Sequence, residues 1–249
     1  MKLNHWQVIA ICILGFSLGY FTGLEYPINT LEPYHPHHIS IEASQANANI
    51  VAVSQRTGKG NIGSVNVRMV PGNGKTLTDT NPFIEASTQL SASTAKNVAE
   101  RLVGMRIVKH DIIYSFDITG TVIGGPSAGV SMAVATAAAM KNRSIRDDVV
   151  ATGSINYDGS IGEVGSIVEK AKAAGEAEMD LFLVPEGQGT FIRYKEEVER
   201  EEVAPGFIVR RRNYIPEKMD LNNYTQENYD MRTEEIRNVR EALNYMLEG

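Results

Sequence analysis

The turn that decides the fold reads Val122-Ile123-Gly124-Gly125-Pro126-Ser127-Ala128-Gly129. Residues 107–117 are rich in β-formers and predict a strand that approaches this turn. The two glycines permit a backbone conformation that is closed to other residues. Pro126 suits the first helical position, so Ser127 is predicted to start an alanine-rich helix that reaches about Asn142. Free N–H groups at a helix start carry partial positive charge and can hold an oxyanion beside the serine hydroxyl.

A lysine, Lys170, stands further along the chain in a predicted helix over residues 165–179. A serine can be made nucleophilic by a neutral lysine alone, without histidine or aspartate. Each residue also has a structural interpretation, because Ser127 could cap its helix and Lys170 could be a surface lysine. The combination with Thr152 favours chemistry. Thr152 precedes a hairpin that Asp158-Gly159 predicts.

The remaining patterns predict a mixture of strands and helices. Two extended runs, 50–53 and 65–70, flank a glycine-rich centre and predict a hairpin. Further strands are predicted over 181–184 and 207–209, and helices over 86–103, 193–202 and 233–247. The helix over 193–202 is charged on all sides and is interpreted as a solvated surface. This mixture indicates an α/β fold, with α+β left open.

Several classes of function are disfavoured by the sequence. A net charge of −6 gives no basic surface for nucleic acid. The run Pro71-Gly72-Asn73-Gly74-Lys75-Thr76 ends like a phosphate-binding loop, but Met69 stands where the pattern requires glycine, so a turn is predicted and no nucleotide. The only cysteine is Cys12, which excludes a disulfide framework. We expect no cofactor.

A histidine cluster in the N-terminal part offers the one candidate for metal binding, with His35, His37 and His38 close together. Two of the three are adjacent, and no cysteine or acidic residue stands at ligand spacing. We therefore expect no metal site.

The N-terminal segment predicts a single membrane-spanning helix. Residues 3–24 contain no Asp, Glu, Lys or Arg, and 8–24 form an apolar run near the lower length limit for crossing a bilayer. A cleaved signal peptide is the alternative, but no small-x-small site lies just after Leu24, and Ala46-Asn47-Ala48 lies too far downstream. The predicted organisation is an anchor over 1–24, a linker over 25–48 and a domain over 49–249. Lys2 precedes the segment and acidic residues follow it, which favours an extracytoplasmic domain.

Over residues 124–174 the sequence resembles the proteolytic domain of Lon proteases. The resemblance is carried by Gly125-Pro126-Ser127-Ala128-Gly129, by Thr152-Gly153-Ser154-Ile155 and by Glu169-Lys170-Ala171. More loosely it extends over about residues 50–186. It implies a Lon-type proteolytic domain in which helices pack on a mixed sheet.

The resemblance also implies roles for five residues. Ser127 is the expected nucleophile, Lys170 the general base, and Thr152 the hydroxyl that orients the lysine. The backbone of Ala128 and Gly129 is expected near the oxyanion. Lysine has a reference pKa of about 10.4, so it must lose its proton near neutral pH to act as a base. Burial in its helix is expected to lower this pKa.

Two positions depart from the family pattern. Gly124 stands where many members carry an acidic residue, and Val168 where some carry a lysine. The sequence also contains no ATPase module. It therefore predicts a membrane-anchored, ATP-independent serine endopeptidase for unfolded polypeptides, which is expected to form homo-oligomers. The alternatives are an inert binding module with the Lon fold, and an amidase or esterase that uses the same dyad on a small substrate.

Overall fold

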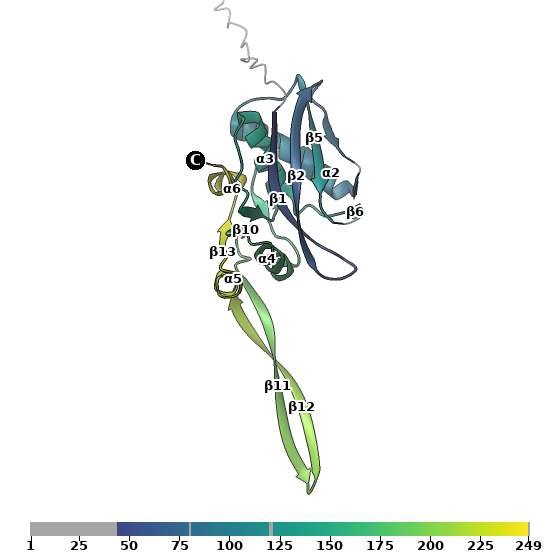
Figure 1. Ribbon diagram of the computed structural model, residues 1–249, viewed down its shortest axis with the longest axis vertical. Helices are drawn as coiled ribbons and strands as arrows, with labels where there is room; N and C mark the ends of the chain where they lie inside the picture. Colours follow the sequence, from purple (N-terminus) through teal and green to yellow (C-terminus); the bar gives the residue numbers. More distant parts are fainter. Residues whose placement is uncertain (1–43, 80, 120–121, 249) are drawn as a thin grey trace, which may run out of the picture. The chain divides into compact units, whose positions relative to one another are not determined.

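The computed structural model describes residues 44–79, 81–119 and 122–248, and its centre is a seven-stranded mixed sheet (Figure 1). The strand order is β13-β10-β7-β1-β2-β5-β3. β2 pairs antiparallel with β1 and β5, and the other neighbours are parallel. The strands are β1 (Ser44–Val53), β2 (Gly60–Pro71), β3 (Thr76–Thr78), β5 (His110–Asp117), β7 (Val149–Ala151), β10 (Leu181–Pro185) and β13 (Arg232–Ile236).

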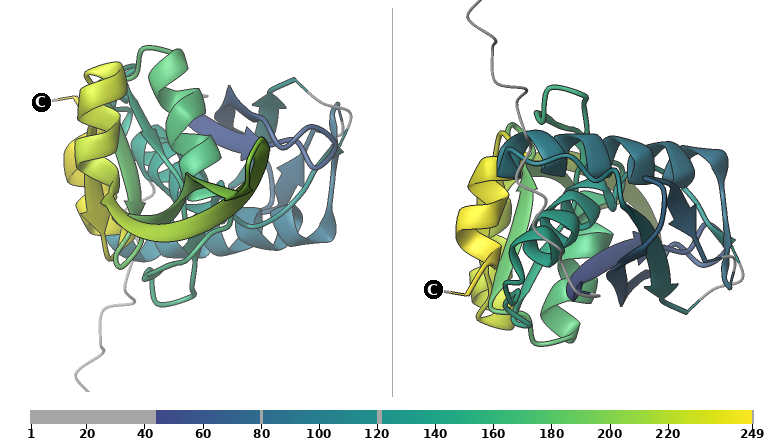
Figure 2. Two further views of the ribbon diagram at one scale, coloured as in Figure 1. Left: turned by 90° about the horizontal axis from the view of Figure 1, so that it is seen from below. Right: turned by 90° about the horizontal axis from the view of Figure 1, so that it is seen from above.

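Helices cover both faces of this sheet (Figure 2). The helices are α2 (Ala86–Val103), α3 (Gly129–Lys141), α4 (Ile167–Glu176), α5 (Leu221–Tyr229) and α6 (Val239–Met246). Successive side chains of a strand point to opposite faces, so Leu181 and Leu183 join the core formed with α2, α3 and α6. Phe182 and Val184 join the second core, with α4 and α5. Burial on both faces explains why β10 is apolar throughout.

The first half of the domain confirms most of the predicted elements. The hairpin is present as β1 and β2, α2 spans the predicted 86–103, and β5 lies within the predicted 107–117. β1 begins at Ser44, inside the segment that the sequence assigns to a linker. The predicted start of the central helix is wrong by two residues, because α3 begins at Gly129 and Ser127 lies in the preceding turn.

Two short strand pairs lie beside the sheet. β4 (Phe83–Ile84) pairs parallel with β6 (Val122–Ile123), which brings the start of α2 next to the serine turn. β8 (Ser154–Ile155) pairs antiparallel with β9 (Ile161–Gly162) and confirms the predicted hairpin. Gly159 has φ 89° at its tip, a conformation that glycine adopts without strain.

The charged helix predicted over 193–202 is wrong. This segment belongs to β11 (Thr190–Ala204), which pairs antiparallel with β12 (Phe207–Asp220) in a long two-stranded ribbon. Pro205 and Gly206 form the turn at its tip, and Gly206 has the positive φ, 81°, that a tight turn after proline requires. Ile192, Tyr194 and Val198 share the alternation of a strand, but Glu196 interrupts it and the abundant charges hide it.

The predicted helix over 233–247 is wrong in its first half. Arg232–Ile236 is β13, which pairs with β10, and only Val239–Met246 is helical as α6. Asn238 starts α6, since its side chain accepts a hydrogen bond from the N–H of Glu241 at 3.1 Å. The sequence analysis did not predict α5.

The N-terminal predictions fall outside the described residues. This holds for the membrane segment over 8–24, for nearly all of the linker and for His35, His37 and His38. Among the residues that the structure does describe, no helix has the length and apolar character needed to cross a bilayer. The same part of the chain contains no cluster of side chains suited to holding a metal ion.

Candidate active site

Ser127 lies in the turn between β6 and α3, and the start of α2 holds this turn in place. Gly125 donates its N–H to the Ser87 hydroxyl at 3.1 Å, and its carbonyl accepts from the Thr88 hydroxyl at 3.1 Å. Gly125 has φ 87°, which explains why a glycine precedes Pro126. The conformation of the serine turn is therefore fixed by α2 on one side and α3 on the other.

The segment after β7 fixes the main chain of the serine. The Ser127 carbonyl accepts a hydrogen bond from the Gly153 N–H at 2.9 Å. A Cβ on Gly153 would lie 2.8 Å from the Val130 side chain, so only glycine allows this close approach. Thr152, the neighbour of Gly153, donates its N–H to the Leu183 carbonyl at 2.9 Å and is thereby held at the end of β10.

Lys170 meets the same segment from α4. Its amine donates to the Thr152 hydroxyl at 3.1 Å, and Thr152 in turn is within 3.4 Å of the Ser127 carbonyl. The Lys170 side chain is almost completely withdrawn from water, at 5% exposed, and Thr152 is fully buried. One hydroxyl therefore connects the lysine with the serine turn.

The environment of Lys170 disfavours its charged form. Burial lowers the pKa of Lys170 to about 8, and within the described residues no carboxylate forms an ion pair with it. An amine with such a pKa is neutral in a substantial fraction of molecules at mildly alkaline pH. This is the property that a general base requires.

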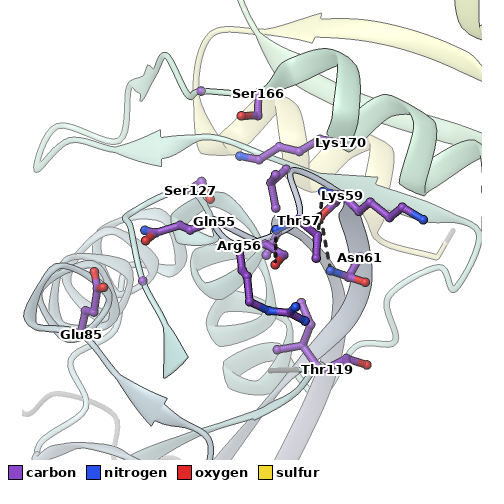
Figure 3. A pocket seen from close by; sticks show the side chains of 16 residues that line it. Gln55, Arg56, Thr57, Lys59, Asn61, Glu85, Thr119, Ser127, Ser166 and Lys170 are labelled. Atoms are coloured by element: carbon purple, nitrogen blue, oxygen red, sulfur yellow. Dashed lines mark hydrogen bonds between the residues drawn. The ribbon is translucent and has the colours of Figure 1, made fainter. Parts of the chain in front are cut away.

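A cavity of about 850 Å³ joins the two residues, since both Ser127 and Lys170 line it. In Figure 3 the Lys170 amine points toward the turn that carries Ser127. Ser166, which starts α4 with φ 56°, lines the cavity beside the lysine. The loop between β1 and β2 supplies another part of the wall, including Arg56 and Lys59. Ser127 and Lys170 thus face a common space large enough for a substrate segment.

The backbone donors differ in their availability. The Gly129 N–H donates to the Pro126 carbonyl at 3.0 Å, so it is already engaged in the turn. In the described part of the chain, the N–H groups of Ser127 and Ala128 bond to no other protein group. Of the two backbone positions predicted near an oxyanion, Ala128 therefore keeps a free donor and Gly129 does not.

Glu85 is a site residue that the sequence analysis missed. It precedes α2 without capping it, and its side chain lines the cavity. A Cβ on Gly124 would lie 2.3 Å from the Glu85 carboxylate, so this group occupies the space into which a side chain at 124 would point. Position 124 therefore has no acidic side chain, but the carboxylate of Glu85, the residue before α2, lies in the space where one would be. The pairing of β4 with β6 brings the two positions together, and no local pattern reveals it.

These features define a mixed α/β domain with a serine at a turn before a buried helix and a buried lysine that lines the same cavity. The family model of the Lon protease (S16) C-terminal proteolytic domain matches residues 34–201. The chain belongs to this family, and membership implies a serine peptidase.

Curated Lon proteases match parts of the same region. The chain is 27% identical over 142 residues to a Lon protease of Fervidobacterium nodosum, which is 56% of this chain and 18% of that protein. It is 32% identical over 100 residues to an archaeal Lon protease of Thermococcus kodakarensis, 39% of this chain and 16% of that protein. A Lon protease of Desulforamulus reducens is 43% identical over 61 residues, which are 24% of this chain and 8% of that protein. The chain therefore spans less than a fifth of the length of these relatives.

Proposed function

We propose that this chain is a serine endopeptidase in which Ser127 attacks the substrate and Lys170 is the general base. The observation that carries the proposal is the environment of the amine. Lys170 is buried, has a lowered pKa, donates a hydrogen bond to the Thr152 hydroxyl and lines the same cavity as Ser127. A surface lysine has no reason to be in such a place, because burying an amine costs free energy unless its chemistry is used.

The proposed reaction begins with neutral Lys170. Its amine takes the proton from the Ser127 hydroxyl as the oxygen attacks the peptide carbonyl. The free N–H groups of Ser127 and Ala128 stabilise the oxyanion that forms. The protonated lysine then gives its proton to the leaving amine, and a water molecule hydrolyses the acyl-enzyme by the same steps in reverse. Thr152 keeps the amine directed toward the serine throughout, because it accepts one of its hydrogen bonds.

We further propose that cleavage is independent of ATP. In the turn that resembles a phosphate-binding loop, the Asp111 carboxylate accepts hydrogen bonds from the N–H groups of Asn73 and Lys75, both at 2.8 Å. A carboxylate thus already occupies donors that a phosphate would need. A reaction that uses no ATP supplies no energy to unfold a substrate, so we propose that the preferred substrates are unfolded or loosely structured polypeptides.

The location of the enzyme is part of the proposal and rests on the sequence of the N-terminal segment. The apolar run over 8–24 anchors the chain in a membrane, and the charges around it favour an extracytoplasmic domain.

A digestion assay with casein, an unstructured protein, tests the function. We expect the full chain to cleave casein without ATP, and Ser127→Ala to lose this activity while keeping an unchanged thermal unfolding curve. Lys170→Arg is the matched control for charge, because arginine cannot supply a neutral base. An active Ser127→Ala variant would rule out the proposed nucleophile. Cleavage only of small esters or amides by the wild type would favour the amidase alternative.

A further inference from the structure

The ribbon of β11 and β12 is the part of the domain that the site does not use. Figure 1 shows it leaving the domain beside α5. In the described part of the chain the two strands form a separate two-stranded sheet, so each of them has one edge without a strand partner. The family match ends at residue 201, within β11, and therefore covers neither β12 nor the paired ribbon.

One face of the ribbon carries most of its exposed apolar side chains, interspersed with charged residues such as Glu196 and Arg212. Successive side chains alternate between faces and directly opposed residues share a face, so the pairing register assigns each side chain. Glu196 is opposed to Tyr214, for example, and Val198 to Arg212. Exposed apolar side chains on this one face are Ile192, Tyr194, Val198, Ile208 and Tyr214. Exposed Val209 and Ile215 lie on the other face. That face also carries ion pairs such as Arg193–Glu217 at 2.8 Å.

A ribbon of this kind is not expected to be stable alone in water. An isolated pair of strands is marginally stable, and independent stability takes at least a third strand with a shared apolar face. Its two open edges are templates for further strand pairing.

The two edges carry opposite charge. Toward the tip, β11 bears five glutamates and one arginine, Arg200, whereas β12 bears three arginines; the glutamates are Glu196, Glu197, Glu199, Glu201 and Glu202, and the arginines of β12 are Arg210, Arg211 and Arg212. Glu196 and Arg212 pair, at 3.3 Å. Within the described residues no ion pair is formed by Glu197, Glu199, Glu201, Arg210 or Arg211. The acidic strand and the basic strand of the same ribbon are thus complementary to each other's open edge in a second copy.

We propose that the ribbon is a self-assembly element, in which the β11 edge of one copy pairs with the β12 edge of a second copy. This arrangement alternates acidic and basic strands, satisfies the open edges and continues the face with most of the exposed apolar side chains across copies. Two different edges meet, so the contact runs head to tail and closes into a ring or extends as a filament. The proposal does not depend on the catalytic roles of Ser127 and Lys170.

Removal of the ribbon is the first test. The Leu221 N–H donates to the Gly189 carbonyl at 2.8 Å, so the ribbon's two ends are joined at its base. Residues 192–218 can therefore be replaced by Asn-Gly in the full chain. By light scattering in detergent, we expect a roughly twofold or greater fall in protein mass, with unchanged thermal unfolding of the domain. Equal mass for both chains, or a monomeric wild type, would overturn the proposal.

Reversing the charges on one strand of the ribbon distinguishes specific edge pairing from nonspecific association. One variant carries Glu197→Lys, Glu199→Lys and Glu201→Lys, and a second carries Arg210→Glu, Arg211→Glu and Arg212→Glu. Each variant by itself places like charges at the contacts between copies. We therefore expect the particles formed by either variant to have a lower mass than those of the wild type. In an equimolar mixture, opposite charges meet again at each contact between the two variants, so the mass should return to that of the wild type. A mixture that remains dissociated contradicts the pairing of these edges.

An unfolded polypeptide is the other candidate to cover the face with most of the exposed apolar side chains. In that case the wild type is monomeric, and the chain without the ribbon loses casein cleavage but keeps cleavage of a short peptide. That pattern would replace self-assembly by substrate binding. Loss of all cleavage in Ser127→Ala leaves the mass measurements unaffected, so the two proposals fail independently.

Discussion

At the scale of single residues, the buried amine of Lys170 is the most costly feature of the domain. It gives up hydration for one hydrogen bond, to Thr152. Its pKa in the folded chain is about 8, below the ordinary value near 10.4. The unfolded chain therefore binds more protons than the folded one between these values, and stability rises with pH across that window. Below about pH 8 the full cost of burying the charge is present.

Replacement of the amine by an isosteric apolar group should therefore stabilise the fold. We expect Lys170→Met to raise the free energy of unfolding at pH 7, by at most about 3 kcal/mol, because the shifted pKa sets the cost of burying the charge. Urea unfolding of the full chain at pH 7 and pH 10 measures this. The gain should shrink at pH 10, where the wild-type amine is largely neutral. A destabilised variant at pH 7 would contradict the assigned burial cost.

The same pKa predicts the pH profile of cleavage. Only the neutral amine accepts the serine proton, so kcat/KM on an unstructured peptide should rise with pH and level off above about pH 8. Initial rates measured from pH 6 to pH 10 give the profile, because this range extends about two pH units on either side of the Lys170 pKa. A profile that is flat over this range argues that Lys170 is not the base.

Thr152 acts through the lysine and should be sensitive to the loss of its hydroxyl. We expect Thr152→Val to lower kcat by roughly 10- to 100-fold with little change in KM, since the amine loses its hydrogen-bond partner but the cavity keeps its shape. Thr152→Ser, which retains the hydroxyl, is the matched control. The pH midpoint of kcat/KM should shift in the valine variant alone. Equal loss in both variants would indicate a packing role.

The sequence names three residues that the structure brings close together, but it does not predict their surroundings. Ser127, Lys170 and Thr152 are found from short local patterns, and the structure brings Thr152 to both of the others. Glu85 was not predicted because its place beside Gly124 depends on the pairing of two short strands far apart in sequence. The engagement of the Gly129 N–H was also missed, because it follows from the true start of α3.

At the scale of elements, the position of α4 on β2 decides where Lys170 lies. Gly60 opens β2, and a Cβ at this position would lie 2.3 Å from the Glu169 carbonyl and 2.7 Å from the Ala173 Cβ. The backbone of α4 cannot move away without moving Lys170. The absence of a side chain at Gly60 therefore allows the helix to bring its amine to Thr152.

Gly60→Ala should accordingly damage both stability and activity. We expect a loss of about 1–3 kcal/mol in the free energy of unfolding, because the added methyl group is forced against backbone. Cleavage should fall together with stability, since α4 is displaced. Gly165→Ala is the control for stability, because a Cβ there meets nothing within 4 Å. Chemical unfolding of both variants makes the comparison, and an unaltered Gly60→Ala protein would contradict the close packing of α4 on β2.

Elements with a local signature are the ones that the sequence predicts correctly. The periodicity of α2 and the turn of the β8–β9 hairpin are such signatures. The ribbon was misassigned because its strand alternation is filled with charged residues, which also suit an exposed helix. In the C-terminal part, Ile236 was placed on a helix because its spacing fits, although its pairing with β10 makes it a strand residue.

At the scale of the whole molecule, the strand order is beyond what the sequence patterns contain. β7 lies between β1 and β10 in the sheet. The side chains on one face of these strands join the first core, and those on the other face join the second. The pattern analysis left α/β and α+β open for this reason, and the family resemblance supplied the mixed sheet that the structure confirms. The predicted membrane segment stays a prediction.

The proposed independence from ATP belongs to this scale. We expect purified full chain to cleave casein at the same rate with and without ATP and Mg²⁺, since the turn at Asn73 and Lys75 already binds the Asp111 carboxylate. A tightly folded protein should resist cleavage until it is unfolded. Stimulation of casein cleavage by ATP would contradict this proposal, and Ser127→Ala controls for contaminating proteases.

The most direct test of the central claim is to trap the acyl-enzyme. A short peptidyl active ester is mixed with the full chain, quenched in acid and digested for mass spectrometry. The account predicts one adduct, on Ser127, that forms faster as the pH rises through about 8 and is absent in Lys170→Met. Ester turnover with an unmodified Ser127, or an adduct that forms equally fast without the lysine, would contradict it.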